Sequence, residues 1–137
     1  MTGLELGLGT VVAATLFGLF WHRRQGRVQV GVDAAAGLPE PVLCRLDRAA
    51  AVTLLLLTAP VCARCPQARA LLSEVAAATP GIRHAELDLA VHPELATELG
   101  VRSTPTTLVV SRTGHELFRV AGVPRRAELL SALQPHL

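Results

Sequence analysis

The chain of 137 residues is long enough for one compact domain, with or without a short appendage. Half of its residues are hydrophobic and 18% are charged, which excludes a disordered chain. Three cysteines are too few for a miniprotein held together by disulfides, and a net charge of +2 is too small to indicate nucleic acid as a partner.

The first feature along the chain is an apolar stretch from Leu4 to Trp21, interrupted by a single acid, Glu5. As a helix this stretch would be about 27 Å long, close to the thickness of the hydrocarbon core of a bilayer. Trp21, at its end, is a residue type common at the membrane surface. The stretch therefore predicts a single membrane-spanning helix; a buried helix of a soluble domain is the alternative.

The charges beside this stretch predict its orientation. No basic residue precedes it, whereas Arg23, Arg24 and Arg27 follow it closely. Because basic residues favour the cytoplasmic side, we expect the rest of the chain in the cytoplasm, with an extracytoplasmic location as the alternative. A cleavable signal peptide would carry its positive charge before the apolar stretch. Residues 1–27 are thus expected to form a transmembrane anchor with a basic collar, which can also contact anionic lipid.

The composition changes over the connecting segment, residues 28–51. Val28 to Val32 alternates in the manner of a short strand, and Asp33 to Pro41 has the glycine and prolines of a linker. Val42 to Ala51 is compatible with a helix, in which Cys44 has apolar neighbours. We expect this segment to supply the first strand and helix of the domain, and Cys44 to be a small buried hydrophobic residue.

Residues 52–137 alternate between strand and helix patterns. Val52 to Leu57 is a continuous apolar run, typical of a strand that is covered on both faces. The elements expected after it are a helix near Cys65 to Ala78, a strand at Ile82 to Leu89, a helix at Pro93 to Leu99 capped by Gly100, a hairpin of Thr106 to Ser111 with Glu116 to Ala121, and a last helix at Pro124 to Leu133. This order predicts an α/β fold in which helices flank a mixed central sheet.

The candidate chemistry lies between the first of these strands and its helix, in Cys62-Ala63-Arg64-Cys65. A thiol at a helix start faces unpaired backbone N–H groups and the positive end of the helix dipole, and Arg64 adds a positive charge. These effects lower the pKa of a cysteine and raise its thiolate fraction. We therefore expect Cys62 to attack disulfides and Cys65 to resolve the mixed disulfide that forms.

Three other interpretations of the cysteine pair remain open: half of a zinc site, a structural disulfide, or two inert thiols. Zinc would need two further ligands, and Cys44, His84 and His92 show no paired spacing that would supply them. Thiol–disulfide exchange itself requires no metal or cofactor.

With these motifs the sequence resembles the thioredoxin family. The resemblance covers Val52 to Leu137 and rests on the cysteine pair after a strand, on the run Gly100-Val101-Arg102-Ser103-Thr104-Pro105-Thr106, and on Gly114 and Gly122. It implies a thioredoxin-like fold. It also implies that Pro105 follows a cis peptide bond and faces the cysteines, and that the backbone of Thr104 pairs with an incoming peptide.

The sequence departs from the family at several positions. Val61 replaces the usual tryptophan, Ala63-Arg64 replaces Gly-Pro, and Leu56 replaces the buried acid that assists proton transfer. Glu86 replaces the lysine that commonly pairs with that acid, which makes it a candidate for proton transfer; a solvated position is the alternative.

Together these features predict a membrane-anchored thiol–disulfide oxidoreductase that acts on disulfides or dithiols of partner proteins. In the cytoplasm the reductase direction is favoured, and another protein would supply the electrons. The alternative is a non-catalytic thioredoxin-like binding module that holds a membrane or extracytoplasmic partner in the groove beside Pro105.

Overall fold

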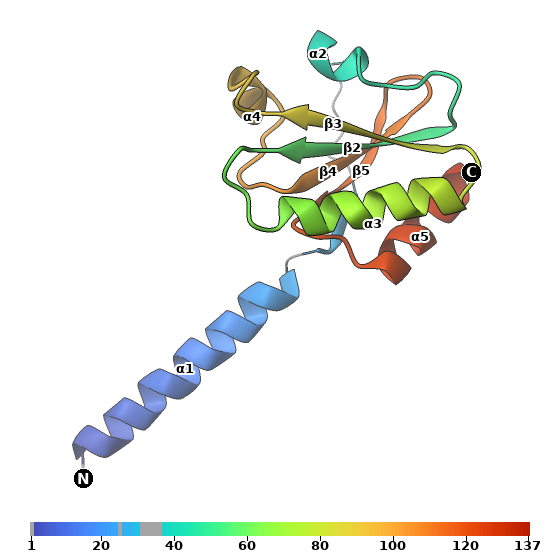
Figure 1. Ribbon diagram of the computed structural model, residues 1–137. Coiled ribbons are helices and arrows are strands. Elements are labelled where there is room, and N and C mark those ends of the chain that lie inside the picture. The colour runs from blue at the N-terminus through green and yellow to red at the C-terminus, as the bar shows by residue number, and fades with distance from the viewer. Residues whose placement is uncertain (1, 25, 31–36) are drawn as a thin grey trace.

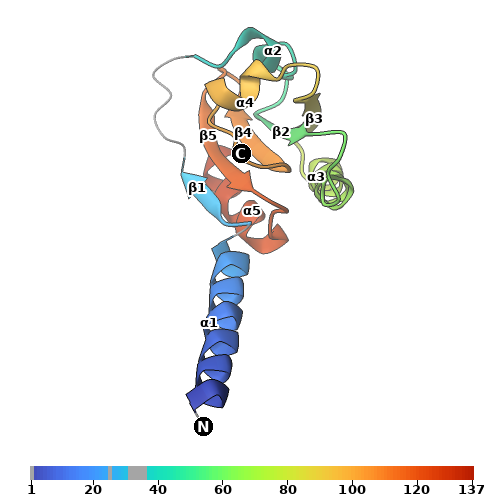
Figure 2. The same cartoon turned by 90° about the vertical axis from the view of Figure 1, so that its left-hand side faces the viewer.

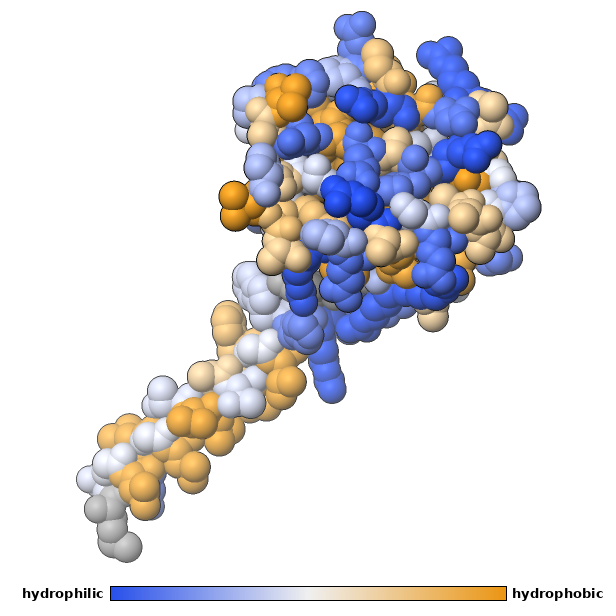
Figure 3. Space-filling model, viewed as in Figure 1, coloured by the Kyte–Doolittle hydropathy of each residue, from blue (hydrophilic) through white to orange (hydrophobic). Residues whose placement is uncertain are grey.

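A single long helix, α1 (Thr2–Arg24), projects from the rest of the chain (Figure 1). The computed structural model describes residues 2–24, 26–30 and 37–137. None of the described residues of α1 is buried, which argues against a core helix, and α1 is long and apolar enough to cross a membrane. A signal sequence near the N-terminus would meet the same criteria of length and composition. Figure 3 shows the contrast between the largely hydrophobic helix and the more hydrophilic domain.

The domain is built on a five-stranded sheet with the strand order β1-β5-β4-β2-β3. Only the β2–β3 pair is parallel among the described strands, and the other three pairs are antiparallel. The strands are β1 (Val28–Val30), β2 (Val52–Thr58), β3 (Ile82–Asp88), β4 (Thr106–Ser111) and β5 (Glu116–Ala121).

Helices cover both faces of this sheet (Figures 1 and 2). Residues of α3 (Cys65–Ala78) and α5 (Arg126–Leu133) share one hydrophobic core with the sheet, and residues of α2 (Glu40–Leu43) and α4 (Glu94–Glu98) belong to a second core. A short 3₁₀ helix, Gln134–His136, follows α5. The predicted α/β fold, a mixed sheet between helices, is confirmed.

Strand β2 lies at the centre of both cores. All of its residues are buried: Leu54 and Leu56 pack in the core beneath α3, whereas Leu55 and Leu57 pack in the core beneath α4. Because successive side chains of a strand point to opposite faces, a continuous apolar run is what a strand covered on both sides requires. The burial fixes the carboxyl end of β2, from which the loop with the cysteine pair begins.

The connecting segment differs from its prediction. Helix α2 spans Glu40–Leu43, not Val42 to Ala51, and Cys44 lies exposed at its end, so the prediction of a buried Cys44 is wrong. The physical reason is local: Asp47 accepts a hydrogen bond from the backbone N–H of Ala49 (2.9 Å), and such side-chain bonds compete with helix formation. Of the strand expected at Val28 to Val32, β1 contains the first three residues; the rest lies outside the described residues, as does much of the expected linker.

Gly26 joins α1 to the domain. Its backbone N–H donates to the carbonyl oxygen of Ala121 (2.7 Å), at the end of β5. Its φ is +80°, and a Cβ atom at this position would lie 2.6 Å from the carbonyl oxygen of Val123. Only glycine fits this approach. The chain that leaves α1 is therefore held against the loop that follows β5.

Candidate functional site

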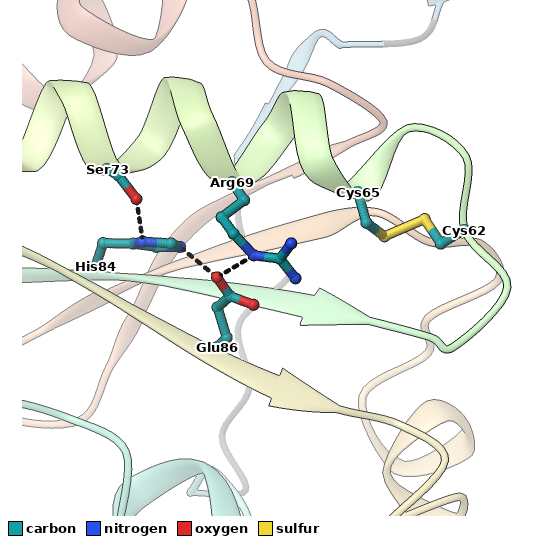
Figure 4. A network of polar contacts seen from close by, with 6 residues as sticks. All are labelled: Cys62, Cys65, Arg69, Ser73, His84 and Glu86. Carbon is teal, nitrogen blue, oxygen red and sulfur yellow. Dashed lines mark hydrogen bonds and ion pairs between the residues drawn. A yellow bond between two sulfur atoms is a disulfide. The ribbon is translucent and has the colours of Figure 1, made fainter.

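Cys62 and Cys65 form a disulfide at the start of α3, with an S–S distance of 2.08 Å and a Cα–Cα distance of 5.4 Å (Figure 4). Cys65 is the first residue of α3 and is 3% exposed, whereas Cys62 is partly exposed. An accessible first sulfur and a buried second one suit the roles of attacking and resolving thiol.

Local geometry explains this placement. The backbone N–H of Cys65 donates to the carbonyl oxygen of Cys62 (3.4 Å), and that of Ala68 donates to Arg64 (3.1 Å), which closes the first helical turn. Pro66 lies in this turn, where a backbone N–H has no partner inside the helix to lose. The cysteines are thus spaced by a turn that leads directly into α3.

The side chains next to Cys62 reach the surface. Val61 is 97% exposed, and Arg64 is exposed between the two cysteines. The tryptophan usual in the family is thus replaced by a small apolar side chain at the surface.

The peptide bond between Thr104 and Pro105 is cis, which confirms the expected geometry. Pro105 is buried, and its carbonyl oxygen accepts a hydrogen bond from the N–H of Gly122 (2.8 Å). Strand β4 begins directly after it, at Thr106. Since Thr106 pairs with Leu57 of β2, the loop before β4 and the loop with the cysteines lie at the same edge of the sheet.

An ion pair that the sequence did not suggest supports this loop. Arg119 of β5 makes two hydrogen bonds to the carboxylate of Glu116, at 2.6 and 2.7 Å, and a third to the carbonyl oxygen of Leu99, at 2.6 Å. The Glu116 side chain is 2% exposed. Leu99 immediately precedes Gly100, where the loop to Pro105 begins. The pair therefore ties that loop to the sheet.

A β-bulge makes this pair possible. Residues three apart in a regular strand point to opposite faces. Here Arg119 lies opposite Leu108 and Glu116 lies opposite Val110, with a register shift between these pairs that leaves Leu117 as the extra residue. The shift brings both charged side chains to the same face of β5, and short-range sequence patterns do not reveal it.

A second row of polar contacts runs along α3 and β3 (Figure 4). Arg69 donates to Glu86 Oε1 (2.6 Å), which is 3.9 Å from His84 Nε2, and His84 Nδ1 is 3.0 Å from Ser73 Oγ. In Figure 4 the guanidinium group of Arg69 lies between Glu86 and the disulfide. Glu86 is thus placed in an ion pair near the cysteines, and no direct contact to them is observed among the described residues.

Beneath α3, Leu56 occupies the position at which the thioredoxin family has a buried acid, so this position is apolar. Leu56 is fully buried and lies between Glu86 of β3 and Thr107 of β4 in the sheet register. Thr107 Oγ1 is buried and has no hydrogen-bond partner among the described residues. Residues directly opposite each other share a face of the sheet, so the Thr107 hydroxyl lies on the same face as the Leu56 side chain. A hydroxyl, not a carboxylate, is the buried polar group here.

Burial and neighbouring charges shift the pKa values of His84 and Arg69. Burial lowers the pKa of His84 below its ordinary value of 6.5, Glu86 opposes that shift, and Arg69 adds to it. The hydrogen bond that Arg69 donates to Glu86 raises the pKa of Arg69, which stays charged. His84 is accordingly neutral at pH 7 and Arg69 is a permanent cation.

A comparison with protein families defines the class of the chain. The model of the thioredoxin family, described as Thioredoxin, matches residues 45–135. Because this match covers more than half of the sequence, the chain belongs to the thioredoxin family. At the level of sequence, no curated protein matches it significantly.

Solved structures share the fold. Thioredoxin-2 of a malaria parasite is 21% identical, with a TM-score of 0.55 over 62% of this chain and 82% of that one. A mutant thioredoxin from Halobacterium salinarum is 22% identical, with a TM-score of 0.56 over 64% and 75% of the two chains. A thioredoxin from Nicotiana alata is 24% identical, with a TM-score of 0.54 over 62% and 72%. At these identities the likeness concerns the fold alone.

The contact between Arg119 and Leu99 predicts a role in holding the loop before Pro105. Arg119→Gln leaves Glu116 buried without its cation, which should lower the free energy of unfolding by about 3 kcal/mol. The loosened loop should raise the KM for a protein disulfide severalfold, while the rate at which Cys62 reacts with a small alkylating reagent stays unchanged. Stopped-flow alkylation and turnover assays measure the two quantities.

Arg112→Gln is the matched control, because Arg112 also donates to a backbone carbonyl, that of Ala50 (3.3 Å), at the opposite end of β4. Its KM should equal that of the wild type. An unchanged KM in Arg119→Gln, or an equal rise in both variants, would contradict the role of Arg119.

The lowered pKa of His84 predicts a pH-dependent stability. In the unfolded chain His84 takes up a proton near pH 6.5, whereas the folded chain resists protonation, so the unfolded state binds more protons below that pH. The free energy of unfolding should fall as the pH is lowered from 7 to about 5.5. Urea titrations at a series of pH values should show a smaller fall for His84→Gln. The variant His115→Gln, at an exposed position, should retain the wild-type slope, and equal slopes for all three proteins would refute the prediction.

Proposed function

We propose that the chain is a membrane-anchored thiol–disulfide oxidoreductase that reduces disulfides of partner proteins through Cys62 and Cys65. The observation that carries this proposal is the pairing of an accessible Cys62 with a buried Cys65 at the start of α3, in a chain of the thioredoxin family. The cis Pro105 at the same edge of the sheet supports it.

The first step is the attack of Cys62. The helix start and the guanidinium group of Arg64 favour the thiolate of reduced Cys62. This thiolate attacks one sulfur of the partner disulfide, and the other partner sulfur leaves as a thiolate that takes up a proton from solvent. Thr104 and Pro105 are the proposed contacts for the backbone of the partner, and exposed Val61 contributes an apolar contact.

The second step releases the product. Cys65 loses its proton and attacks the Cys62 sulfur of the mixed disulfide, which frees the second partner thiol. The partner has then gained two electrons and two protons, and Cys62 and Cys65 are joined as in Figure 4. A reductase protein returns two electrons to start another cycle. This sequence of steps needs no metal and no cofactor bound to the chain.

Glu86 is the proposed acceptor for the proton of Cys65. Its carboxylate forms an ion pair with Arg69, which lies one helical turn after Cys65. Because Arg69 lies between the carboxylate and the disulfide, we propose that the proton travels by way of solvent at the edge of α3.

Helix α1 is the proposed anchor, with the domain on the cytoplasmic side. Its length, its apolar composition and the absence of burial support a membrane span. The basic residues at its carboxyl end, Arg23 and Arg24, and the nearby Arg27 support the cytoplasmic orientation. In that compartment thiols are kept reduced, which favours the reductase direction.

The activity is tested by turnover of a protein disulfide with the full chain in detergent and with a chemical dithiol as electron source. Cys62→Ser should abolish turnover. Cys65→Ser should accumulate the mixed disulfide, because attack is intact and resolution is lost, and mass spectrometry detects this species. Glu86→Gln should slow the resolution step, whereas Asp88→Asn, on the same strand, should not.

Cys44→Ser is the matched control for loss of a thiol, since Cys44 is free and exposed. It should turn over like the wild type. Turnover that survives Cys62→Ser, or wild-type protein without turnover, would refute the enzyme and favour a non-catalytic binding module.

Cys44 also provides a test of orientation. In a chain with Cys62→Ser and Cys65→Ser it is the single remaining thiol, because the sequence has three cysteines. A membrane-impermeant maleimide should label it only after cells or spheroplasts that express the chain are permeabilised. Labelling in intact cells would place the domain outside the cytoplasm, and the variant that also carries Cys44→Ser gives the background.

A further inference from the structure

A small hollow lies where the end of α1 meets the cysteine loop. It has a volume of about 120 Å³ and is lined by His22, Arg64, Val123 and Arg125. These residues come from three separate parts of the chain: the last turn of α1, the segment between the two cysteines, and the loop before α5. Hydrophilic side chains gather at this junction in Figure 3.

The charge of the hollow is suited to an anion. Two of its lining side chains are guanidinium groups, and none of them is acidic. Arg125 has an acidic neighbour outside the hollow, Glu128 (3.0 Å), which occupies one of its donors. A guanidinium group carries five donors in a planar fork that matches phosphate oxygens. The hollow has room for a group of the size of one phosphate.

The position of the hollow along α1 indicates where a phosphate group could come from. His22 directly follows Trp21, the last residue of the apolar stretch. In an anchored chain this residue lies where the hydrocarbon core ends and the lipid headgroups begin. A group bound beside His22 is therefore at the depth of the lipid phosphates.

We propose that His22, Arg64 and Arg125 form a binding site for the phosphate group of an anionic lipid, and that this lipid regulates the reactivity of Cys62. The proposal rests on the membrane anchoring proposed above. Arg64 belongs to the hollow and to the cysteine segment at once, so a phosphate bound there offsets the positive charge that favours the Cys62 thiolate. Anionic lipid should thus make Cys62 less reactive at neutral pH.

The test uses the full chain with Cys44→Ser, reduced and reconstituted in lipid nanodiscs. Alkylation of Cys62 by iodoacetamide, an uncharged reagent, is followed at pH 7 by mass spectrometry. The lipid response is the rate in discs of phosphatidylcholine divided by the rate in discs that also contain phosphatidylglycerol. We expect a response of about threefold, which corresponds to half a pH unit in the titration of the thiol.

Two variants separate the hollow from the general surface charge of the membrane. Arg125→Gln removes a lining guanidinium and should reduce the response, and Arg125→Lys, which keeps the charge but not the planar fork, should give a response between those of Arg125→Gln and the wild type. Arg126→Gln removes the same charge one residue later, where the side chain pairs with Glu74 (2.9 Å) and does not line the hollow, and it should keep the full response. Equal responses in Arg125→Gln and Arg126→Gln would overturn the proposal.

Inorganic phosphate distinguishes the source of the anion. Added to phosphatidylcholine discs at constant ionic strength, it should leave the rate unchanged; a decrease equal to that caused by phosphatidylglycerol would overturn the assignment to lipid. Alkylation reports on the thiol whether or not the chain reduces protein disulfides. A chain that shows the lipid response but no turnover would refute the proposed activity alone, and a chain that does not enter the discs would refute the anchoring and this proposal with it.

Discussion

The burial of β2 on both faces is the constraint on which the rest of the domain depends. Its side chains join the core beneath α3 to the core beneath α4, and its neighbours β3 and β4 are hydrogen-bonded to it on either side. Because each face is covered, a shift of one residue in register would move every side chain of β2 from one core into the other. The loop that carries Cys62 and the loop that carries Pro105 are therefore brought to one edge of the sheet by hydrophobic packing, before any contact between them is considered.

Much of this arrangement follows from local sequence patterns. The apolar run of β2, the helical spacing of α3 and the order of strands and helices each reflect burial that repeats along the chain. The cysteine pair is predictable from sequence because its chemistry depends on a short segment, whereas the cis peptide bond before Pro105 is implied by the resemblance to the thioredoxin family. The structure agrees with these predictions because the residues that define them are neighbours in sequence.

The remaining features depend on contacts between distant segments. Cys44 is the exception, because its exposure has a local cause: Asp47 bonds the backbone N–H of Ala49, and the helix ends early. Glu116 meets Arg119 through a bulge, and their third partner, Leu99, comes from another loop. The ion pair of Glu86 with Arg69 likewise joins a strand to a helix. Periodicity describes which face is buried, and it does not identify the partner of a particular charge.

The short connection at Gly26 has a consequence for the choice of partners. The hydrogen bond to Ala121 and the pairing of β1 with β5 hold the domain close to the end of α1 instead of on a long tether. For an anchored chain, Cys62 then remains at nearly one height above the bilayer while the protein diffuses in two dimensions. A partner disulfide is accessible when it lies at that height. In an anchored chain, the height of a partner's disulfide above the membrane would then select substrates as much as the partner's sequence around that disulfide.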